Sequence, residues 1–220
     1  QLRAGTINFV ANEFEYAVSI IQKSSSDKLI DIPDAVLASV LEDNGWIVKF
    51  GNQYSVQEKG LKATAFEYSD YYDRISDLTG LENFPNLEKI SISVDYYMEK
   101  IDISGLHHVQ ELNLLYGMGL SVFNFGDNPI IAYNLSTSLG VRYTEAETLT
   151  FISKNMEELD LTMSMSAFYS YTKTLDVSEF PALKKLNATS LSNVLETIYL
   201  KTGQEIPELL KPESVKIEYK

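Results

Sequence analysis

The apolar residues between positions 75 and 93 follow neither a helical repeat nor a strand repeat. In ISDLTGLENFPNLEKISIS they are spaced three residues apart four times and then two apart, at Leu78, Leu81, Phe84, Leu87, Ile90 and Ile92. A helix has a period of about 3.6 residues and a strand a period of about 2. A coil that joins one short strand to a return path of about three residues per turn gives both spacings. The pattern therefore predicts the repeating unit of a solenoid.

The end of this pattern, written L-x-x-L-x-L, recurs along the chain. Five copies follow one another at steps of 22, 21, 26 and 27 residues, and two looser copies follow at steps of 12 and 17. The copies lie at Leu87/Ile90/Ile92, Val109/Leu112/Leu114, Ile130/Tyr133/Leu135, Met156/Leu159/Leu161, Leu183/Leu186/Ala188, Leu195/Ile198/Leu200 and Pro212/Val215/Ile217. Stacked coils bury an apolar row that a single coil leaves exposed. Since a step of 12 is too short for a full coil, we expect the last two copies to be half-coils or a C-terminal cap.

A second repeat supports the same architecture. The segment KIDISGLHHVQELNL at 100–114 parallels TLDVSEFPALKKLNA at 174–188. In both, an Asp-aliphatic-Ser step begins seven residues before the first apolar residue of the next L-x-x-L-x-L copy. Two coils of one solenoid are expected to match in this way.

Residues 1–60 have a different pattern. Phe14, Tyr16, Val18 and Ile20 alternate with polar or small residues, which predicts a strand in an N-terminal extension of residues 1–28. A helix with Phe14, Val18 and Ile21 on one face is the weaker alternative. Residues 29–60 predict a helical cap, since IPDAVLASVLEDNG has a proline and an aspartate where a helix begins and a glycine where it ends. The solenoid is predicted to occupy residues 61–220.

The chain resembles the leucine-rich-repeat family, and more narrowly the internalin-like repeat proteins of bacterial surfaces. The resemblance rests on IPDAVLASVLEDNG, on ISDLTGLENFPNLEKISIS and on the LDVS-type steps, and covers roughly residues 30–200. It implies an α/β fold, a short irregular solenoid with parallel strands on a concave face, irregular or 3₁₀ return segments and an N-terminal helical cap. It also implies a position at the cell surface or outside the cell, for example as a lipoprotein anchored through an upstream segment.

In such relatives the cap helix is commonly followed by a calcium-loop-like stretch. The corresponding KFGNQYSVQE at 49–58 has Lys49 and Gly51 where ligand aspartates would stand, and keeps only Glu58. Calcium requires several converging oxygen ligands, and a lysine adds repulsion. We therefore expect no calcium here, but a turn held by the packing of Tyr54 and Val56.

The charge narrows the choice of partner. The chain has a formal net charge of −13, which disfavours nucleic acid and anionic membranes because both are bound through Lys and Arg. No apolar run approaches the roughly 20 residues of a membrane span, so no transmembrane segment is predicted. Cysteine is absent, which removes disulfides and thiolate chemistry.

The sequence does not favour an enzyme. His107 and His108 are adjacent in a predicted turn, where one side chain points away when the other points in. No nucleophile elbow, phosphate-binding loop or dinucleotide fingerprint occurs. The acidic residues between 145 and 160 are more simply a solvated surface than a glycosidase pair. We expect no catalysis, no cofactor and no metal site.

Two groups of residues are candidates for ligand contact. Tyrosines follow the predicted strands and would share one edge of the solenoid, as Tyr96, Tyr97, Tyr116 and Tyr169, with further aromatics at Tyr68, Tyr71, Tyr72, Tyr143, Phe168 and Tyr171. Polar residues at strand centres would form a ledge on the concave face, as Asn113, Asn134, Asp160 and Asn187, together with Ser91, Tyr199 and Lys216. The alternative is structural, with aromatics folded over the ends of the core and small polar residues fitted to close strand spacing.

We therefore predict a non-catalytic protein-binding module that uses its concave face and its aromatic loop edge. The acidic surface would favour a basic protein partner and salt-sensitive association. A carbohydrate-binding module is the alternative, since tyrosine rings also stack on sugars. A structural spacer without a ligand is the third hypothesis.

Overall fold

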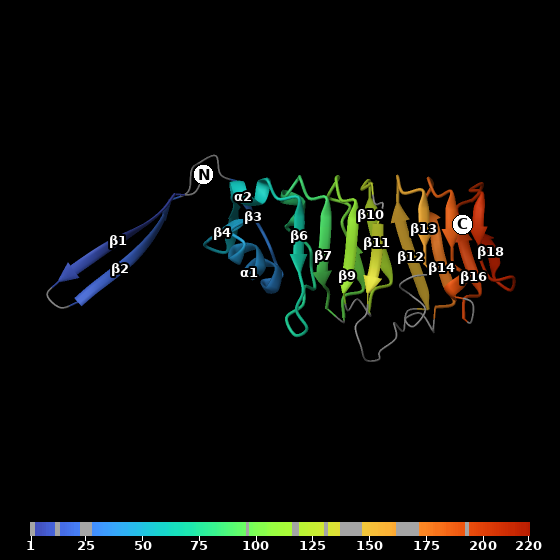
Figure 1. Ribbon diagram of the computed structural model, residues 1–220, viewed down its shortest axis with the longest axis horizontal. Helices are drawn as coiled ribbons and strands as arrows, with labels where there is room; N and C mark the ends of the chain where they lie inside the picture. The colour runs from blue at the N-terminus through green and yellow to red at the C-terminus, as the bar shows by residue number, and fades with distance from the viewer. Residues whose placement is uncertain are drawn as a thin grey trace.

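The structure is a computed structural model, and it shows a parallel β-solenoid (Figure 1). It describes residues 3–11, 14–22, 28–95, 97–115, 119–129, 132–136, 147–161, 172–191 and 194–220. Strands predominate in this part of the chain, and the helices are few and short. The strands lie side by side along the long axis of the solenoid, and each runs across that axis.

One side of the solenoid carries two parallel sheets. The four-stranded sheet consists of β6 (Ala65–Tyr68), β7 (Lys89–Ser93), β9 (Glu111–Leu115) and β11 (Ala132–Ser136). The three-stranded sheet consists of β13 (Glu158–Asp160), β15 (Lys185–Asn187) and β17 (Glu208–Leu210). The predicted L-x-x-L-x-L copies from residue 87 to residue 188 coincide with strands of these sheets, which confirms the solenoid prediction.

The other side carries one six-stranded parallel sheet. Its members are β8 (Lys100–Asp102), β10 (Val122–Gly126), β12 (Thr148–Ser153), β14 (Thr174–Glu179), β16 (Thr197–Leu200) and β18 (Lys216–Tyr219). The chain thus alternates between the two sides, with one strand on each. The short step in the sequence now has a reason, because the copy at Leu195/Ile198/Leu200 is β16, half a coil beyond β15.

The expectation of irregular or 3₁₀ return segments is wrong for most of the chain. The return segments form the regular six-stranded sheet, and the described 3₁₀ turns are limited to η1 (Leu81–Asn83) and η2 (Thr189–Leu191). The described fold is therefore mostly β rather than α/β. Large aromatic side chains explain the difference, since the fully buried rings of Phe123 and Phe151 stack at 4.7 Å between ring centres on β10 and β12. Such pairs of neighbouring strands gain stability from their ring contact.

The core between the two sides is continuous along the solenoid. Ile90 and Ile92 of β7 and Leu112 and Leu114 of β9 are 0% exposed. These residues belong to the same apolar cluster as the inward side chains of the six-stranded sheet. Inward apolar residues alternate with outward polar ones along both sets of strands, as the period of a strand requires.

The N-terminal part confirms two predictions. The predicted strand is β2 (Phe14–Gln22), which pairs with β1 (Arg3–Ala11) in an antiparallel hairpin, and the helical alternative is wrong. In Figure 1 this hairpin extends away from the solenoid. The 49–58 stretch is the turn between two antiparallel strands, with Tyr54 buried and Val56 packed on the core as expected.

Between the hairpin and the solenoid lies a small unit that we call the helical unit, residues 28–61. Its elements are β3 (Leu29–Ile30), α1 (Ala35–Asp43), β4 (Ile47–Phe50), β5 (Gln53–Val56) and α2 (Glu58–Leu61). The Asp34 carboxylate accepts a hydrogen bond from the Leu37 backbone N–H at 2.7 Å and caps α1. The unit lies at the N-terminal end of the strand stack, and its helix buries Leu37 and Leu41 in the common core (Figure 1).

Candidate functional site

Two turns with the sequence Asp-Tyr-Tyr lie in consecutive coils. They begin at Asp70 and Asp95, 25 residues apart (95 − 70), and follow the neighbouring strands β6 and β7. The Asp70 carboxylate accepts a hydrogen bond from the Tyr72 N–H at 2.7 Å, and the Asp95 carboxylate accepts one from the Tyr97 N–H at 2.8 Å. An aspartate that accepts from the residue two positions later forms an Asx turn. Both turns therefore hold the second tyrosine by the same backbone geometry.

These turns present tyrosine rings to solvent. Tyr72 is 88% and Tyr97 is 89% exposed. Tyr71 is half-exposed and meets Tyr72 edge-on at 5.1 Å between ring centres, while the guanidinium of Arg74 lies 5.1 Å from the Tyr71 ring centre. Rings so exposed cover no part of the core, so the structural interpretation does not apply to Tyr72 and Tyr97. We call Tyr71, Tyr72 and Tyr97 the tyrosine edge.

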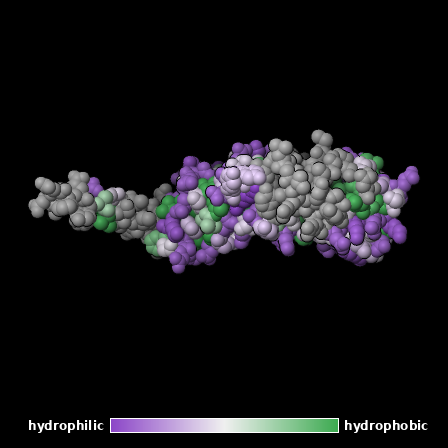
Figure 2. Space-filling model, turned by 90° about the horizontal axis from the view of Figure 1, so that it is seen from below, coloured by the Kyte–Doolittle hydropathy of each residue, from purple (hydrophilic) through white to green (hydrophobic). Residues whose placement is uncertain are grey.

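The surroundings of the tyrosine edge are polar. The loops that follow β6, β7 and β9 lie at the lower edge in Figure 1, and Figure 2 views this edge from below. The described surface in that view is mostly hydrophilic, with small separate hydrophobic areas. Hydrogen bonds from the backbone N–H groups of Asp73 and Tyr72 lower the pKa of Asp70, so this carboxylate stays charged beside the rings.

The match between the two coils continues beyond the turns. Asp77-Leu78-Thr79-Gly80-Leu81 corresponds to Asp102-Ile103-Ser104-Gly105-Leu106 at the same offset of 25 residues (102 − 77). The Asp77 carboxylate accepts from the Thr79 N–H at 2.8 Å, and the Asp102 carboxylate accepts from the Ser104 N–H at 3.0 Å. The structure thus repeats one motif in two adjacent coils.

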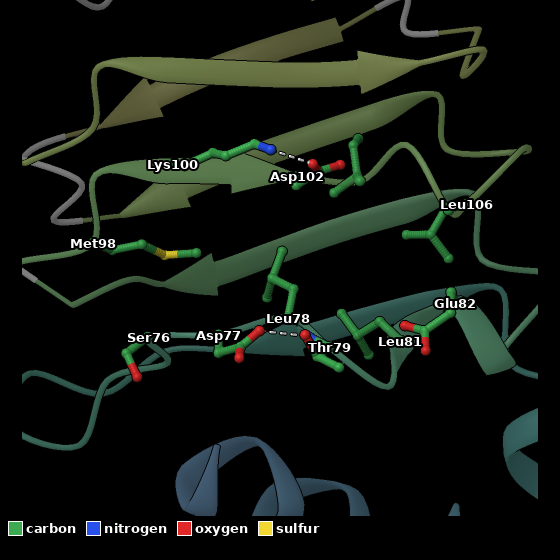
Figure 3. A pocket seen from close by; sticks show the side chains of 12 residues that line it. Ser76, Asp77, Leu78, Thr79, Leu81, Glu82, Met98, Lys100, Asp102 and Leu106 are labelled. Carbon is green, nitrogen blue, oxygen red and sulfur yellow. Dashed lines mark hydrogen bonds and ion pairs between the residues drawn. The ribbon is translucent and has the colours of Figure 1, made fainter. Parts of the chain in front are cut away.

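A groove of about 440 Å³ separates these two matched segments. Ser76, Asp77 and Thr79 form one wall, and Lys100 and Asp102 of β8 form the other (Figure 3). The floor is apolar, with Leu78, Met98 and Leu106 almost fully buried. Met98 directly follows Tyr97 in the chain, so the tyrosine edge and the groove are continuous.

The helical unit holds the two walls apart. The second oxygen of the Asp34 carboxylate accepts hydrogen bonds from the Ser76 N–H at 2.8 Å, from the Ser76 hydroxyl at 2.7 Å and from the Asp77 N–H at 3.2 Å. The segment around Ser76 is therefore bound to the start of α1 and does not continue the six-stranded sheet, in which β8 is the terminal strand. At the far end, Gly105 allows a close approach, because a Cβ there would lie 3.0 Å from the Cβ of Glu82.

The groove carries a surplus of negative charge. Its lining contains the carboxylates of Asp77, Glu82 and Asp102 and the ammonium of Lys100, which gives a net charge of −2 (1 − 3). Burial would raise the pKa of Asp102, but hydrogen bonds from Lys100, Ser104 and Asn124 outweigh it and lower that pKa to about 2. Asp102 is therefore ionised throughout the physiological range.

The sign of this shift predicts a pH dependence of stability. The folded pKa of Asp102 lies below its ordinary value of 3.8, so its contribution is complete above about pH 4 and is lost as the pH falls toward 2. We expect wild type to exceed the Asp102→Asn variant in free energy of unfolding at pH 6, and the difference to shrink by pH 2.5. Its size should stay below about 1 kcal/mol, because the side chain is 37% exposed and water screens the ion pair. Urea unfolding of both proteins at the two pH values measures this, and a difference that is unchanged at pH 2.5 would refute it.

The structure brings the predicted ledge residues together only in pairs. Asn113 is half-buried and is the register partner of Asn134 in the four-stranded sheet, and Asp160 is the register partner of Asn187 in the three-stranded sheet. The Asn187 amide lies 3.5 Å from the Asp160 carboxylate. No description is given of the Asn134 side chain, which lies outside the described part, as do Tyr96, Tyr116 and Tyr169.

Two residues of the expected ledge lie elsewhere. Tyr199 belongs to β16 and Lys216 to β18, and both strands are in the six-stranded sheet on the opposite side. Their assignment to a common ledge with Asn113 is wrong. The physical reason is the half-coil step, which carries the chain to the other side between β15 and β16.

The part of the site that the sequence prediction missed is the groove. The 25-residue identity of D-Y-Y and of the D-x-x-G-L step could have paired the two coils. No local signal indicates that Asp34 binds Ser76, since the two are 42 residues apart.

Among the described residues, no three His, Asp or Glu side chains are grouped so that they could hold a metal ion. His107 and His108 are both exposed. No helix in the described part is long and apolar enough to cross a membrane. In the comparisons with known proteins, no family model and no curated protein matches the chain.

Proposed function

We propose that this chain is a non-catalytic protein-binding module that recognises its partner with the tyrosine edge. The observation that supports it is the exposure of Tyr72 and Tyr97, 88% and 89%, on two matching Asx turns. Tyrosine is enriched among the residues that dominate binding energy in interfaces. A ring on a preorganised turn loses less conformational entropy on binding than a ring on a loose loop.

The proposal includes the leucine-rich-repeat type, internalin-like, with the helical unit as its cap. The repeat spacing of 21–27 residues, the parallel solenoid and the position of α1 at its N-terminal end support this. It also includes display at a bacterial cell surface or outside the cell, which follows from the resemblance of the sequence.

The charge of the chain defines the partner further. A net charge of −13, and carboxylates that outnumber lysine in the groove beside the tyrosine edge, favour a partner with a basic surface. Exposed charges are screened within about 8 Å at physiological ionic strength. We therefore expect association to slow and weaken as salt is raised.

The test replaces both exposed rings, in the variant Tyr72→Ala/Tyr97→Ala. We expect it to lose at least about tenfold in partner affinity, because each interface ring of this kind contributes on the order of 1–2 kcal/mol or more. Its melting temperature should match wild type, since neither ring packs in the core. Wild type and variant are applied to an array of surface proteins and glycans, with captured proteins quantified by biolayer interferometry.

A matched control is Tyr219→Ala, which removes a 59% exposed tyrosine on β18, at the C-terminal end of the solenoid. It should bind as wild type does. A salt-insensitive glycan signal that the double variant loses would favour the carbohydrate alternative. Absence of any signal, or a double variant with a lowered melting temperature, would favour the spacer.

A further inference from the structure

We infer that an extended, basic segment of the protein partner binds in the groove by adding a strand to the free edge of β8. This inference rests on the proposed protein-binding function and specifies how the partner is held. Four properties of the groove support it: the free main-chain groups of β8, the occupied donors of the facing wall, the apolar floor and the surplus of carboxylates.

The direction of the β8 main chain follows from its pairing with β10. The Glu99 carbonyl accepts from the Val122 N–H at 3.1 Å, and the Ile103 N–H donates to the Asn124 carbonyl at 2.9 Å. In a parallel strand the main-chain groups of alternate residues point to opposite sides. Odd-numbered residues of this stretch therefore face β10, and the N–H and C=O groups of Lys100 and Asp102 face the groove.

The facing wall has no comparable groups to offer. Its N–H donors are taken by carboxylates: those of Ser76 and Asp77 by Asp34, that of Thr79 by Asp77, and that of Gly80 by Glu82 at 2.7 Å. This wall therefore cannot pair with β8, and β8 keeps an open edge within the described sheet. An open edge beside a groove is the geometry of strand addition, in which main-chain hydrogen bonds give affinity.

The lining defines which segment fits. Alternate side chains of an added strand would point to the floor of Leu78, Met98 and Leu106, where apolar residues are favoured. The intervening side chains would point outward, past Asp77 and Glu82, where Lys and Arg are favoured by charge. A volume of about 440 Å³ suits a short stretch of chain rather than a folded surface. As the segment leaves the groove beside Met98, it reaches Tyr97.

The test compares two substitutions at one position. Lys100→Pro removes the N–H that faces the groove, and a proline is tolerated at the first residue of an edge strand. Lys100→Ala is the matched control, because it removes the same side chain and its ion pair with Asp102 but keeps the N–H. Random peptides displayed on phage are selected on the wild-type protein. An enriched peptide is then synthesised, and its affinity is measured by fluorescence anisotropy.

We expect the selected peptides to alternate apolar and basic residues and to bind Lys100→Pro at least about tenfold more weakly than Lys100→Ala. In the wild-type protein, hydrogen exchange of the Lys100 and Asp102 amides should slow at least about tenfold when the peptide is bound. This second measurement requires no variant and decides the matter if Lys100→Pro does not fold.

Two results would overturn strand addition: no enrichment of peptides, or an enriched peptide that leaves these two amides unprotected. The function itself is tested separately by Tyr72→Ala/Tyr97→Ala. A folded protein partner that is lost with the double tyrosine variant, but bound equally by Lys100→Pro and Lys100→Ala, would keep the protein-binding function and reject the added strand.

Discussion

We expect the Asp34→Ala variant to lose about 3–5 kcal/mol in free energy of unfolding at the N-terminal end of the solenoid. The Asp34 side chain is buried and accepts four hydrogen bonds, one from Leu37 and the others from Ser76 and Asp77. Loss of a helix N-cap costs about 1 kcal/mol, and each buried donor left without a partner costs about 1–3 kcal/mol. Part of that cost is recovered where water reaches the freed groups.

Trp46 makes this loss measurable. It is the one tryptophan of the chain, and its ring packs at 5.6 Å from Phe66 of β6 and at 5.3 Å from Phe84, measured between ring centres. Its fluorescence therefore reports the junction between the helical unit and the first coils. This matters because coils of a solenoid can unfold separately, so that a global signal would mix transitions. Urea unfolding followed at Trp46 should shift to lower urea in Asp34→Ala.

The control for this experiment is Asp43→Ala, at the last residue of α1, where the carboxylate is exposed. It removes the same charge from the same helix and should change stability by no more than about 0.5 kcal/mol. Equal shifts of the Trp46 transition in the two variants would contradict the role assigned to Asp34. A destabilised Asp34→Ala variant should also bind the groove peptide more weakly, because the released wall can then move toward β8.

The sequence predicted one side of the solenoid better than the other. Ile90, Ile92, Leu112 and Leu114 alternate with polar residues within a longer apolar template, and local burial alone places them inward. The return strands are shorter: β8 has three residues, with Ile101 as its one inward side chain. So short an alternation resembles a turn until the neighbouring strand β10 supplies its hydrogen bonds.

The candidate site divides in the same way. Tyr97 was a candidate because its position after a strand places it on the loop edge, and its exposure agrees with that. Tyr72 belongs to the same edge, but the recurrence of Asp-Tyr-Tyr was needed to single it out. The groove depends on a contact between Asp34 and Ser76 over 42 residues and on the absence of pairing beside β8 in the described sheet. Neither can be derived from local propensity, since both result from how the helical unit packs on the first coil.

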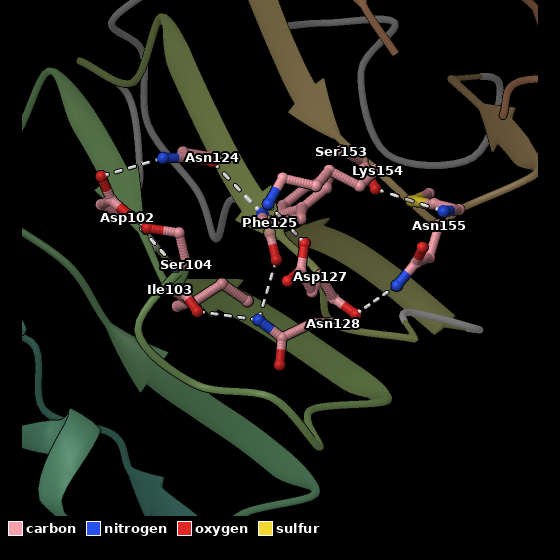
Figure 4. Close-up of polar contacts among 12 residues, drawn as sticks. Asp102, Ile103, Ser104, Asn124, Phe125, Asp127, Asn128, Ser153, Lys154 and Asn155 are labelled. Carbon is pink, nitrogen blue, oxygen red and sulfur yellow. Dashed lines mark hydrogen bonds and ion pairs between the residues drawn. The ribbon is translucent and has the colours of Figure 1, made fainter. Parts of the chain in front are cut away.

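The second large effect is expected in the interior, at Asn128. Its side chain is 0% exposed, its carbonyl accepts from the Val109 N–H at 3.0 Å, and its amide donates to the Ile103 carbonyl at 2.7 Å and the Phe125 carbonyl at 2.8 Å (Figure 4). Leucine at this position has nearly the same shape but leaves three main-chain groups buried without a partner. We expect Asn128→Leu to lower the free energy of unfolding by about 3–5 kcal/mol, measured by far-ultraviolet circular dichroism in urea.

The chain offers a matched control one coil later, at Asn155, 27 residues beyond Asn128 (155 − 128). Asn155 follows β12 as Asn128 follows β10, and its amide donates to the Asp127 carbonyl at 2.7 Å, but its side chain is exposed (Figure 4). Water can replace that one bond, so Asn155→Leu should cost less than about 1 kcal/mol. If the two leucine variants were equally stable, burial of Asn128 would not be what links these coils. A large difference would show that the turn asparagines stabilise the solenoid only where the next coil excludes water from them.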